Sequence, residues 1–294
     1  MVDSFEKWII FFSTPLFTVL ILGEIFLSHW HHKKLYTLAD TATNVLMMVS
    51  NMGVDLLMRG ISLFMLTLAF DYRFAELNPH SWIYWLTLFL LEDFIFYWLH
   101  RMDHTIRLLW AIHVTHHSSE EFNLTTGFRS SVFQPLYRFI WFIPLALAGF
   151  NAFDIFIMYS ITQIYGILVH TKYIRKMGVL EHVLVTPSHH RVHHASNIEY
   201  LDKNMGMILI IWDKWFNTFE AEKDDVSIEY GIYQKKTGFN PLNVIFHEWK
   251  AIWCDVRKAQ GLRNKLNYML KPPGWSHDGS TKTSEELRKE AGIK

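Results

Sequence analysis

Three histidine clusters in the middle of the chain constrain its fold more than any other feature. They hold eight of the 17 histidines and read His100-x-x-x-His104, His113-x-x-His116-His117 and His190-x-x-His193-His194. Residues three or four apart share one face of a helix, so each cluster can direct its imidazoles to a common point. Such spacing is typical of metal ligands.

Eight converging nitrogens exceed the needs of one four- or six-coordinate ion, so a pair of first-row metal ions is the simplest occupant. Imidazole suits iron, zinc and copper alike, so the ligands alone do not select the metal. A single HxxxH also occurs among surface or core histidines that bind nothing. Two copies of HxxHH following it are far harder to obtain by chance, and they favour a metal centre.

Five apolar segments indicate the medium in which this chain folds. They are Trp8–Leu27, Val45–Phe70, Ser81–Leu99, Leu136–Gly149 and Ala152–Val169. The first is long enough to span a bilayer, and without a basic leading region or a small-residue cleavage site we expect a retained anchor. The fourth is short, and we expect it to form a helical hairpin with the fifth, turning at Gly149-Phe150-Asn151.

The fold class predicted is an all-α integral membrane protein of four to five hydrophobic helices, with a cytoplasmic helical cap holding a histidine-rich dimetal site. The cytoplasmic side follows from the placement of lysine and arginine. They gather after the first, third and fifth segments, at Lys33, Lys34, Arg101, Arg107, Arg129, Arg138, Lys172, Arg175 and Lys176. We expect a multi-pass protein with one membrane-embedded domain over residues 1–270 and a polar, solvated C-terminal tail over 271–294.

The composition of the chain limits which classes of binding partner are expected. The formal net charge is zero and no basic run carries interleaved aromatics, so nucleic acid is not an expected partner. The single cysteine, Cys254, excludes an internal disulfide and a thiolate metal site. The expected partners are the bilayer and a lipid.

Polar residues inside the second segment fall on one helix face. They are Asp40, Asn44, Asn51, Asp55, Arg59 and Ser62. Two interpretations stay open at this point. Either Asp55 and Arg59 pair at i,i+4 while the others join helices, or the stripe lines a cavity for substrate or water.

The third and fifth segments add candidates beside the clusters. Asp93 shares a helix face with His100 and His104, and we predict that it accepts an imidazole N–H, with a helix-packing role as the alternative. Glu92 points to another face. His170 emerges on the same side as the clusters and is a candidate ninth ligand, although a lone histidine is often structural.

Two further sites lie next to the clusters. Glu120 and Glu121 follow the second cluster closely and are candidate catalytic residues, the alternative being a solvated surface position. Thr186-Pro187-Ser188 has the pattern of a helix start, so the third cluster is predicted to lie on the first turns of a helix. His189 is either a ligand or an outer partner.

These motifs resemble the fatty acid hydroxylase/sterol desaturase superfamily, and within it the ether-lipid monooxygenases. The stretches that carry the resemblance are HRMDH (His100–His104), HVTHHSSEEFN (His113–Asn123), TPSHHRVHH (Thr186–His194) and DKNMGMILIIWDKWFNTFEAE (Asp202–Glu222). The likeness covers about Leu35 to His247 and implies that the eight clustered histidines are the core ligands.

The resemblance also implies an activity. Members of that superfamily are membrane enzymes that use O2 to oxidise C–H bonds of lipids at two iron ions, for which zinc is an expected surrogate. An external reductant is required, either tetrahydrobiopterin or an electron-transfer protein. We therefore expect an O2-dependent lipid hydroxylase, with an ether lipid as first substrate and a sterol, fatty acyl or carotenoid chain, hydroxylated or desaturated, as alternatives.

A metal-ion transporter is the hypothesis from a different class. It would need ionisable residues converging near the bilayer midplane, where the second segment offers Asp55 and Arg59. An arginine there repels cations, and the histidines concentrate at the cytosolic edge instead. The charge pattern thus favours the enzyme.

Overall fold

Helices build nearly all of the regular structure in this protein. The computed structural model describes residues 2–293, and within them it contains no β-strand. The α-helices are α1 (Val2–Trp30), α2 (Leu38–Asp71), α3 (Trp82–Thr105), α4 (Arg107–His117), α5 (Arg138–Ala148), α6 (Ala152–Leu168), α7 (Pro187–His193), α8 (Ile211–Trp215), α9 (Pro241–Lys258), α10 (Leu262–Leu270) and α11 (Ser284–Glu290). Short 3-10 helices are η1 (Thr126–Phe128), η2 (Gln134–Leu136), η3 (Gly178–His182) and η4 (Ile198–Tyr200). The all-helical prediction is confirmed.

Local sequence explains the hairpin between α5 and α6. Gly149 ends α5 with a φ of +106°, a left-handed conformation that glycine adopts without steric cost. A Cβ at this position would lie 2.4 Å from the carbonyl oxygen of Ala75, so only glycine fits. Asn151 then caps α6 by accepting a hydrogen bond from the Phe153 N–H. The turn lies where the sequence predicted it.

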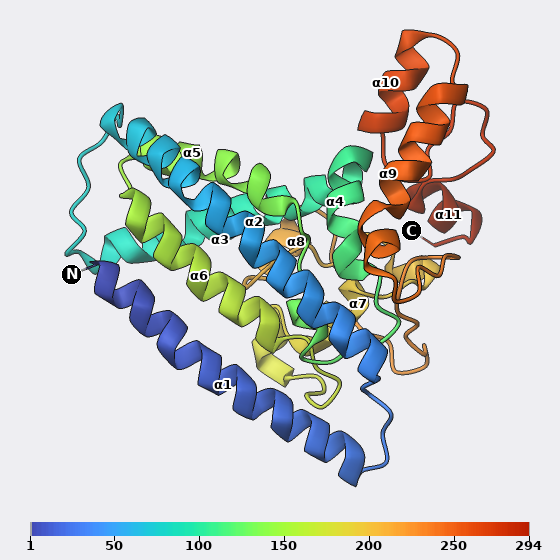
Figure 1. Cartoon of the computed structure of the whole chain (residues 1–294), viewed down its shortest axis with the longest axis horizontal. Coiled ribbons are helices and arrows are strands. Elements are labelled where there is room, and N and C mark those ends of the chain that lie inside the picture. The colour runs from blue at the N-terminus through green and yellow to red at the C-terminus, as the bar shows by residue number, and fades with distance from the viewer. Residues whose placement is uncertain (1, 294) are drawn as a thin grey trace.

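The long helices form a bundle, and α4 and α7, which carry two of the histidine clusters, lie at one end of it (Figure 1). α5 and α6 pack against both α2 and α3, and α1 packs against α6. Their shared core is apolar and includes the buried side chains of Leu66, Leu88, Leu145 and Ile155. α4 packs against the end of α3 and against α9, which connects the bundle to α9 and α10.

The bundle exposes much apolar surface. α2 and α3 are long and apolar enough to cross a membrane, and α6 is a shorter apolar helix. Leu56 and Leu57 on α2 are 72% and 79% exposed, and several neighbours on α1 and α2 are similarly open. Soluble monomers rarely expose contiguous apolar faces of this kind, so the protein associates with a membrane.

The polar stripe of α2 connects that helix to other segments. Asn51 donates to the Ser131 carbonyl, while Asp55 pairs with Arg138 and, at 3.6 Å, with Arg59. A cavity of only about 20 Å³ lies beside Asp55, Arg59 and Ser62. Most residues of the stripe therefore pair at i,i+4 or join α2 to other segments, as the first interpretation predicted.

Glu24 is a buried carboxylate on the otherwise apolar α1. It accepts hydrogen bonds from the hydroxyls of Tyr36 and Thr171 and, at 2.8 Å, from the Leu124 N–H. Thr171 directly follows His170, so Glu24 connects α1 to a segment beside the histidine clusters. Satisfying every oxygen of a buried carboxylate in this way offsets its desolvation cost.

Residues 271–293 were predicted to form a solvated tail. In the structure they remain largely exposed, but they fold back so that α11 packs against η4. The Arg288 guanidinium donates to the Leu201 carbonyl at this contact. This segment consequently forms part of the wall of a cavity described below.

Candidate metal centre

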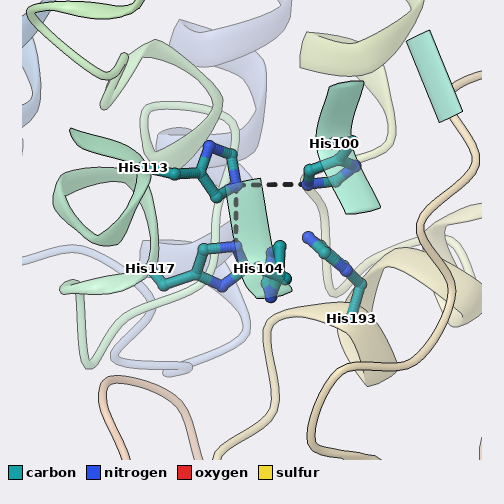
Figure 2. Close-up of side chains that lie close together, drawn as sticks. All are labelled: His100, His104, His113, His117 and His193. Carbon is teal, nitrogen blue, oxygen red and sulfur yellow. Dashed lines mark hydrogen bonds between the residues drawn. The ribbon is translucent and has the colours of Figure 1, made fainter. Parts of the chain in front are cut away.

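Nine histidines converge in two adjacent groups. Group A contains His100, His104, His113, His117 and His193, and group B contains His116, His170, His190 and His194. Within each group one ring nitrogen per residue lies within 4.8 Å of every other. Figure 2 shows group A with its imidazoles pointing toward one another. His170, which no cluster contains, thus joins the eight clustered histidines.

Helix periodicity explains how two clusters divide between the groups. In the HxxHH of α4, His113 and His117 are one turn apart and enter group A, while His116 enters group B. The third cluster divides the other way, since His190 and His194 enter group B and His193 enters group A. The adjacent histidines of each HxxHH therefore face different groups.

The spacing of the ring nitrogens suits a metal ion in each group. The Nε2 atom of His113 lies 3.1 Å from that of His100 and 3.2 Å from that of His117. In group B, His170 Nε2 lies 3.0 Å from His190 Nε2 and 3.1 Å from His194 Nε2. Two nitrogens bound at right angles to one ion, each at about 2.1 Å, lie about 3.0 Å apart.

Unpartnered nitrogens support the same conclusion. The Nε2 atoms of His104 and His193 are buried and have no hydrogen-bond partner within residues 2–293. A buried polar atom without a partner is costly, and such an atom in a native protein usually marks an unseen ligand or ion. The donor set therefore fits a pair of first-row metal ions, among them iron and zinc.

Burial favours the neutral form of His113, His116, His190 and His194. It lowers the pKa of His116 to about 4 and the pKa values of His113, His190 and His194 well below the usual value of 6.5. Neighbouring histidines lower them further because two imidazolium ions would repel. Metal binding requires the neutral ring, so burial prepares the site for metal.

Most Nδ1 atoms in group A face an acceptor outside the group. The three short contacts are His100 Nδ1 with the Met205 carbonyl at 2.8 Å, His193 Nδ1 with the Lys203 carbonyl at 3.0 Å and His104 Nδ1 with Asp202 Oδ1 at 3.1 Å. A carbonyl oxygen can only accept, so Nδ1 carries the hydrogen there. The Nε2 lone pair is then free to face the centre of the group.

His113 and group B have different acceptors. His113 Nδ1 lies 3.4 Å from Ser131 Oγ and 3.7 Å from Asp103 Oδ2 on α3. In group B, His116 Nδ1 donates to the Arg129 carbonyl at 3.0 Å and His170 Nδ1 to the Gly166 carbonyl at 2.7 Å. Backbone carbonyls thus orient two of the four group B rings.

Asp93 is buried, as its helix face predicted, but it has other partners. Its carboxylate accepts from the N–H groups of Ile208 and Leu209 at 2.9 and 3.1 Å, and from Trp212 Nε1 at 2.8 Å. The acceptor of His100 is instead the Met205 carbonyl. Asp93 therefore holds the segment that follows this carbonyl, one step further from the imidazoles than we expected.

The two candidate glutamates lie outside both histidine groups in the described chain. Glu120 is exposed and pairs with Lys236 at 3.0 Å. Glu121 is half-buried, and burial raises its pKa. His189 is also outside the groups, because its side chain closes the capping box that starts α7 at Thr186. The predicted helix start at Thr186-Pro187 is confirmed.

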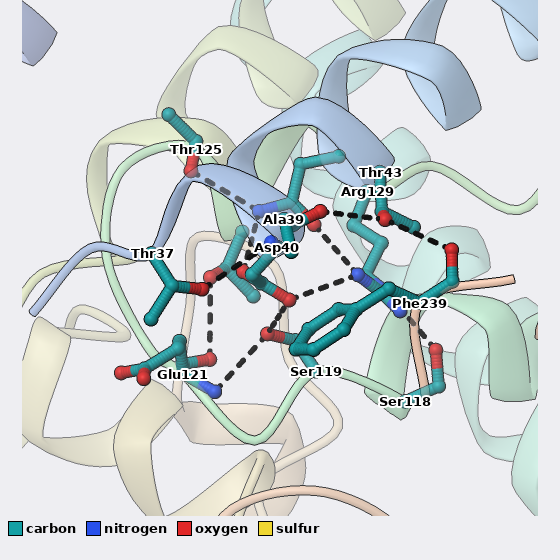
Figure 3. Close-up of polar contacts among 12 residues, drawn as sticks. Thr37, Ala39, Asp40, Thr43, Ser118, Ser119, Glu121, Thr125, Arg129 and Phe239 are labelled. Carbon is teal, nitrogen blue, oxygen red and sulfur yellow. Dashed lines mark hydrogen bonds and ion pairs between the residues drawn. The ribbon is translucent and has the colours of Figure 1, made fainter. Parts of the chain in front are cut away.

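Sequence analysis counted Arg129 only among the loop charges, but it is a fully buried arginine behind α4 (Figure 3). Its guanidinium donates to the Thr115 carbonyl at 3.1 Å, to Asp40 Oδ1 at 3.1 Å and to Asn44 Oδ1 at 2.9 Å. Its own carbonyl accepts from His116. Arg129 therefore connects the end of α4 to the start of α2. The polar stripe on α2 was the available signal for such a partner.

A cavity of about 660 Å³ opens beside group A, and His104, His117 and His193 form part of its lining. Trp110 lines it next to them. Its charged residues are paired, for Arg107 lies 2.8 Å from both Glu248 and Asp255, and Lys235 lies 3.4 Å from Glu248. Residues between Pro273 and Leu287 form the outer wall. The volume is that of a typical small-molecule site.

Comparison with known proteins agrees with this centre. Residues 85–218, which contain all nine histidines, match the fatty acid hydroxylase family. This region belongs to that family. The predicted resemblance is confirmed by alkylglycerol monooxygenase from Homo sapiens, 39% identical over 90% of this chain and 59% of that protein, and from Xenopus tropicalis, 37% identical over 93% and 60%.

More distant relatives extend the family. Ornithine lipid hydroxylase from Rhizobium tropici is 29% identical over 50% of this chain and 44% of its own length. The chain spans about three fifths of the length of the two alkylglycerol monooxygenases. No solved structure matches it.

Proposed function

We propose that this protein is a membrane-bound, O2-dependent lipid hydroxylase of the monooxygenase type, whose groups A and B each hold one iron ion. The observation that carries the proposal is the convergence of nine mostly buried imidazoles at one end of an apolar helix bundle. The match to the fatty acid hydroxylase family supports the same chemistry.

The reaction balances when an external reductant supplies two electrons. A lipid C–H bond, O2, two electrons and two protons give a C–OH bond and water. A pair of iron ions supplies the oxidising power for this step, which side chains do not possess. We infer that tetrahydrobiopterin or an electron-transfer protein is the reductant, arriving from the aqueous side.

The substrate proposed first is an ether lipid, because the three relatives of highest stated identity are alkylglycerol monooxygenases. Hydroxylation of the carbon next to an ether oxygen gives a hemiacetal, which breaks into an aldehyde and an alcohol. The residues of this chain would bind and orient the lipid. The cavity beside group A offers room for part of it, with paired charges that suit an uncharged polar group.

The test is incubation of iron-loaded membranes with ¹⁸O2, each candidate reductant, and a panel of ether lipids, sterols and fatty acyl lipids. The proposal expects ¹⁸O in the product of one lipid class, and no product from a His116→Ala variant. Failure of every lipid and reductant combination, in protein that holds two iron ions, would count against the activity.

We further propose a multi-pass topology with the histidine groups facing the cytoplasm. It is supported by the lysines and arginines that follow α1, α3 and α6. Reporters inserted after Lys34 and Thr115 are expected to be cytoplasmic, and one near Asn78 is expected on the opposite side. A lumenal or periplasmic signal at Thr115 would reverse the orientation.

A further inference from the structure

One short loop, residues 202–205, carries the acceptors of three of the five group A imidazoles. It supplies one carboxylate and two backbone carbonyls, and each contact is 3.1 Å or shorter. We refer to residues 202–205 as the acceptor loop. The directions of His100, His104 and His193 therefore depend on the conformation of four consecutive residues.

The backbone conformation of the acceptor loop is unfavourable in free energy. Asp202 and Asn204 have φ values of +53° and +55°, in the left-handed region that non-glycine residues visit rarely. Such residues persist only where surrounding contacts determine them. The acceptor loop must consequently be held in place by other parts of the molecule.

Asp213 provides the main support. Its fully buried carboxylate accepts from the Met205 N–H at 2.6 Å and from the Gly206 N–H at 2.8 Å, and a third hydrogen bond comes from the Thr218 hydroxyl at 2.6 Å. The fit is close, because a Cβ on Gly206 would lie 2.9 Å from Asp213 Oδ2 and 2.7 Å from the Leu209 carbonyl oxygen. The end of the loop thus wraps around one carboxylate.

Asn204 anchors the middle of the loop. Its side-chain amide donates to the His189 carbonyl at 3.0 Å and to the Glu220 carbonyl at 2.8 Å. Its backbone N–H donates to the Thr218 carbonyl at 2.8 Å. Since Thr218 also contacts Asp213, the two anchors share one support. The loop is therefore fixed both to α7, which carries His193, and to the segment after α8.

We propose that Asp213 is a positioning residue for group A, which acts through the acceptor loop to orient His100, His104 and His193. The proposal deepens the proposed function, on which it rests. The proposal also predicts that a change at Asp213 affects the metal site of group A and not that of group B. The Nδ1 acceptors of His116 and His170 in group B are the carbonyls of Arg129 and Gly166, which lie outside the loop. Disturbing Asp213 should weaken one of two metal sites.

The first test titrates cobalt(II) into metal-free full-length protein carrying Asp213→Asn and follows the number of ions bound, their affinities and the cobalt absorption spectrum. An asparagine carries an NH2 group that cannot accept, so it cannot satisfy both N–H donors of the loop. We expect one site to weaken by about 10–100-fold and the other to keep its parent affinity, as losses of outer partners typically do. Asp225→Asn, an exposed and chemically identical change, is the matched control.

A second variant disturbs the same loop by a different contact. Gly206→Ala forces the loop away from Asp213 and should reproduce the selective loss, whereas Gly53→Ala, where an added Cβ meets nothing within 4 Å, should not. Parent affinities at both sites in either Asp213→Asn or Gly206→Ala would overturn the proposal, and so would equal weakening of both sites. A parent protein that binds no metal would instead overturn the proposed function, and with it this inference.

Discussion

Groups A and B are built from the same kind of side chain, yet their surroundings differ. Three imidazoles of group A line a cavity of about 660 Å³, while within the described chain none of group B is among its lining residues. The Phe122 ring packs on group B, and its centroid lies 5.4 Å from the ring centroid of His170 and 5.3 Å from that of His194. Tyr230 stacks on Phe122 in turn, at 5.0 Å. Group A therefore borders the cavity, and aromatic rings pack on part of group B.

This difference indicates that one centre can combine a metal site that molecules reach with a metal site that is held rigidly. Metal sites that only hold their ion are typically closed, whereas sites that react keep a position open. We infer that group A exchanges molecules with the cavity, and that group B, oriented by backbone carbonyls and covered by aromatic rings, keeps its ion in place. Four predictions test this division.

The largest effect is expected from removing one ligand in each group. His193→Ala should cost the ion of group A, and His116→Ala the ion of group B, each leaving about one iron per chain. Oxidation should fall by at least about 100-fold in both, since even outer partners of ligands contribute 10–100-fold. Iron content and product formation check this, with the exposed His80→Ala as control. Full activity in either ligand variant would contradict the assignment.

Filling the cavity should slow turnover without removing iron. Ala251 on α9 lines the cavity, so Ala251→Phe is expected to lower product formation by about tenfold, which corresponds to about 1.4 kcal/mol. Lys250→Phe, on the exposed face of the same helix, should have little effect. If both variants retain the parent rate and iron content, the cavity does not serve group A.

Loosening the cover of group B should show in metal release. Aromatic pairs contribute about 0.5–1.5 kcal/mol, so Phe122→Leu should speed extraction of the slower-released iron by a chelator by about 2- to 10-fold. Phe128→Leu removes the edge-to-face contact with Phe17, at 5.6 Å, and serves as control. Faster release of the quicker iron alone would reverse our assignment of open and covered groups.

Asp93 and Glu92 should give the smallest effects. Asp93→Asn loosens the segment after the acceptor loop, so we expect group A to bind metal less than about tenfold more weakly, below the effect of Asp213→Asn. Glu92 accepts from the Thr162 hydroxyl at 3.1 Å, and Glu92→Gln should leave metal binding unchanged. An Asp93→Asn variant with parent affinity would assign Asp93 to helix packing alone.

Sequence periodicity predicted those parts of the centre that local structure determines. Histidines four apart enter the same group, as one helix face predicts, and Thr186-Pro187 begins a helix. The expectation that each cluster converges on a single point was wrong for the second and third clusters, because histidines three apart in them enter different groups. The hairpin at Gly149 followed from a segment too short to stand alone. Which histidines share a group was not predictable, because it depends on how α3, α4 and α7 cross.

The outer partners were harder to predict because they come from distant segments. Asp93 lies 115 residues before its partner Ile208, so its helix face showed that it is buried but not what it binds. Arg129 and Asp40 are 89 residues apart and pair only after α2 has packed against η1, which Arg129 follows. Asp202 uses a left-handed turn that no periodicity reveals. Contacts set by tertiary packing leave little trace in local sequence.

Glu24 has a consequence for how the protein is made. The three groups that satisfy its carboxylate belong to Tyr36, Leu124 and Thr171, and the last of these is 147 residues further along the chain. During synthesis α1 leaves the ribosome long before that partner exists, and an unpaired carboxylate is costly in a bilayer. Stable packing of α1 is therefore coupled to completion of the segment carrying His170. A nascent chain that stalls before this point leaves the Glu24 carboxylate without its Thr171 partner.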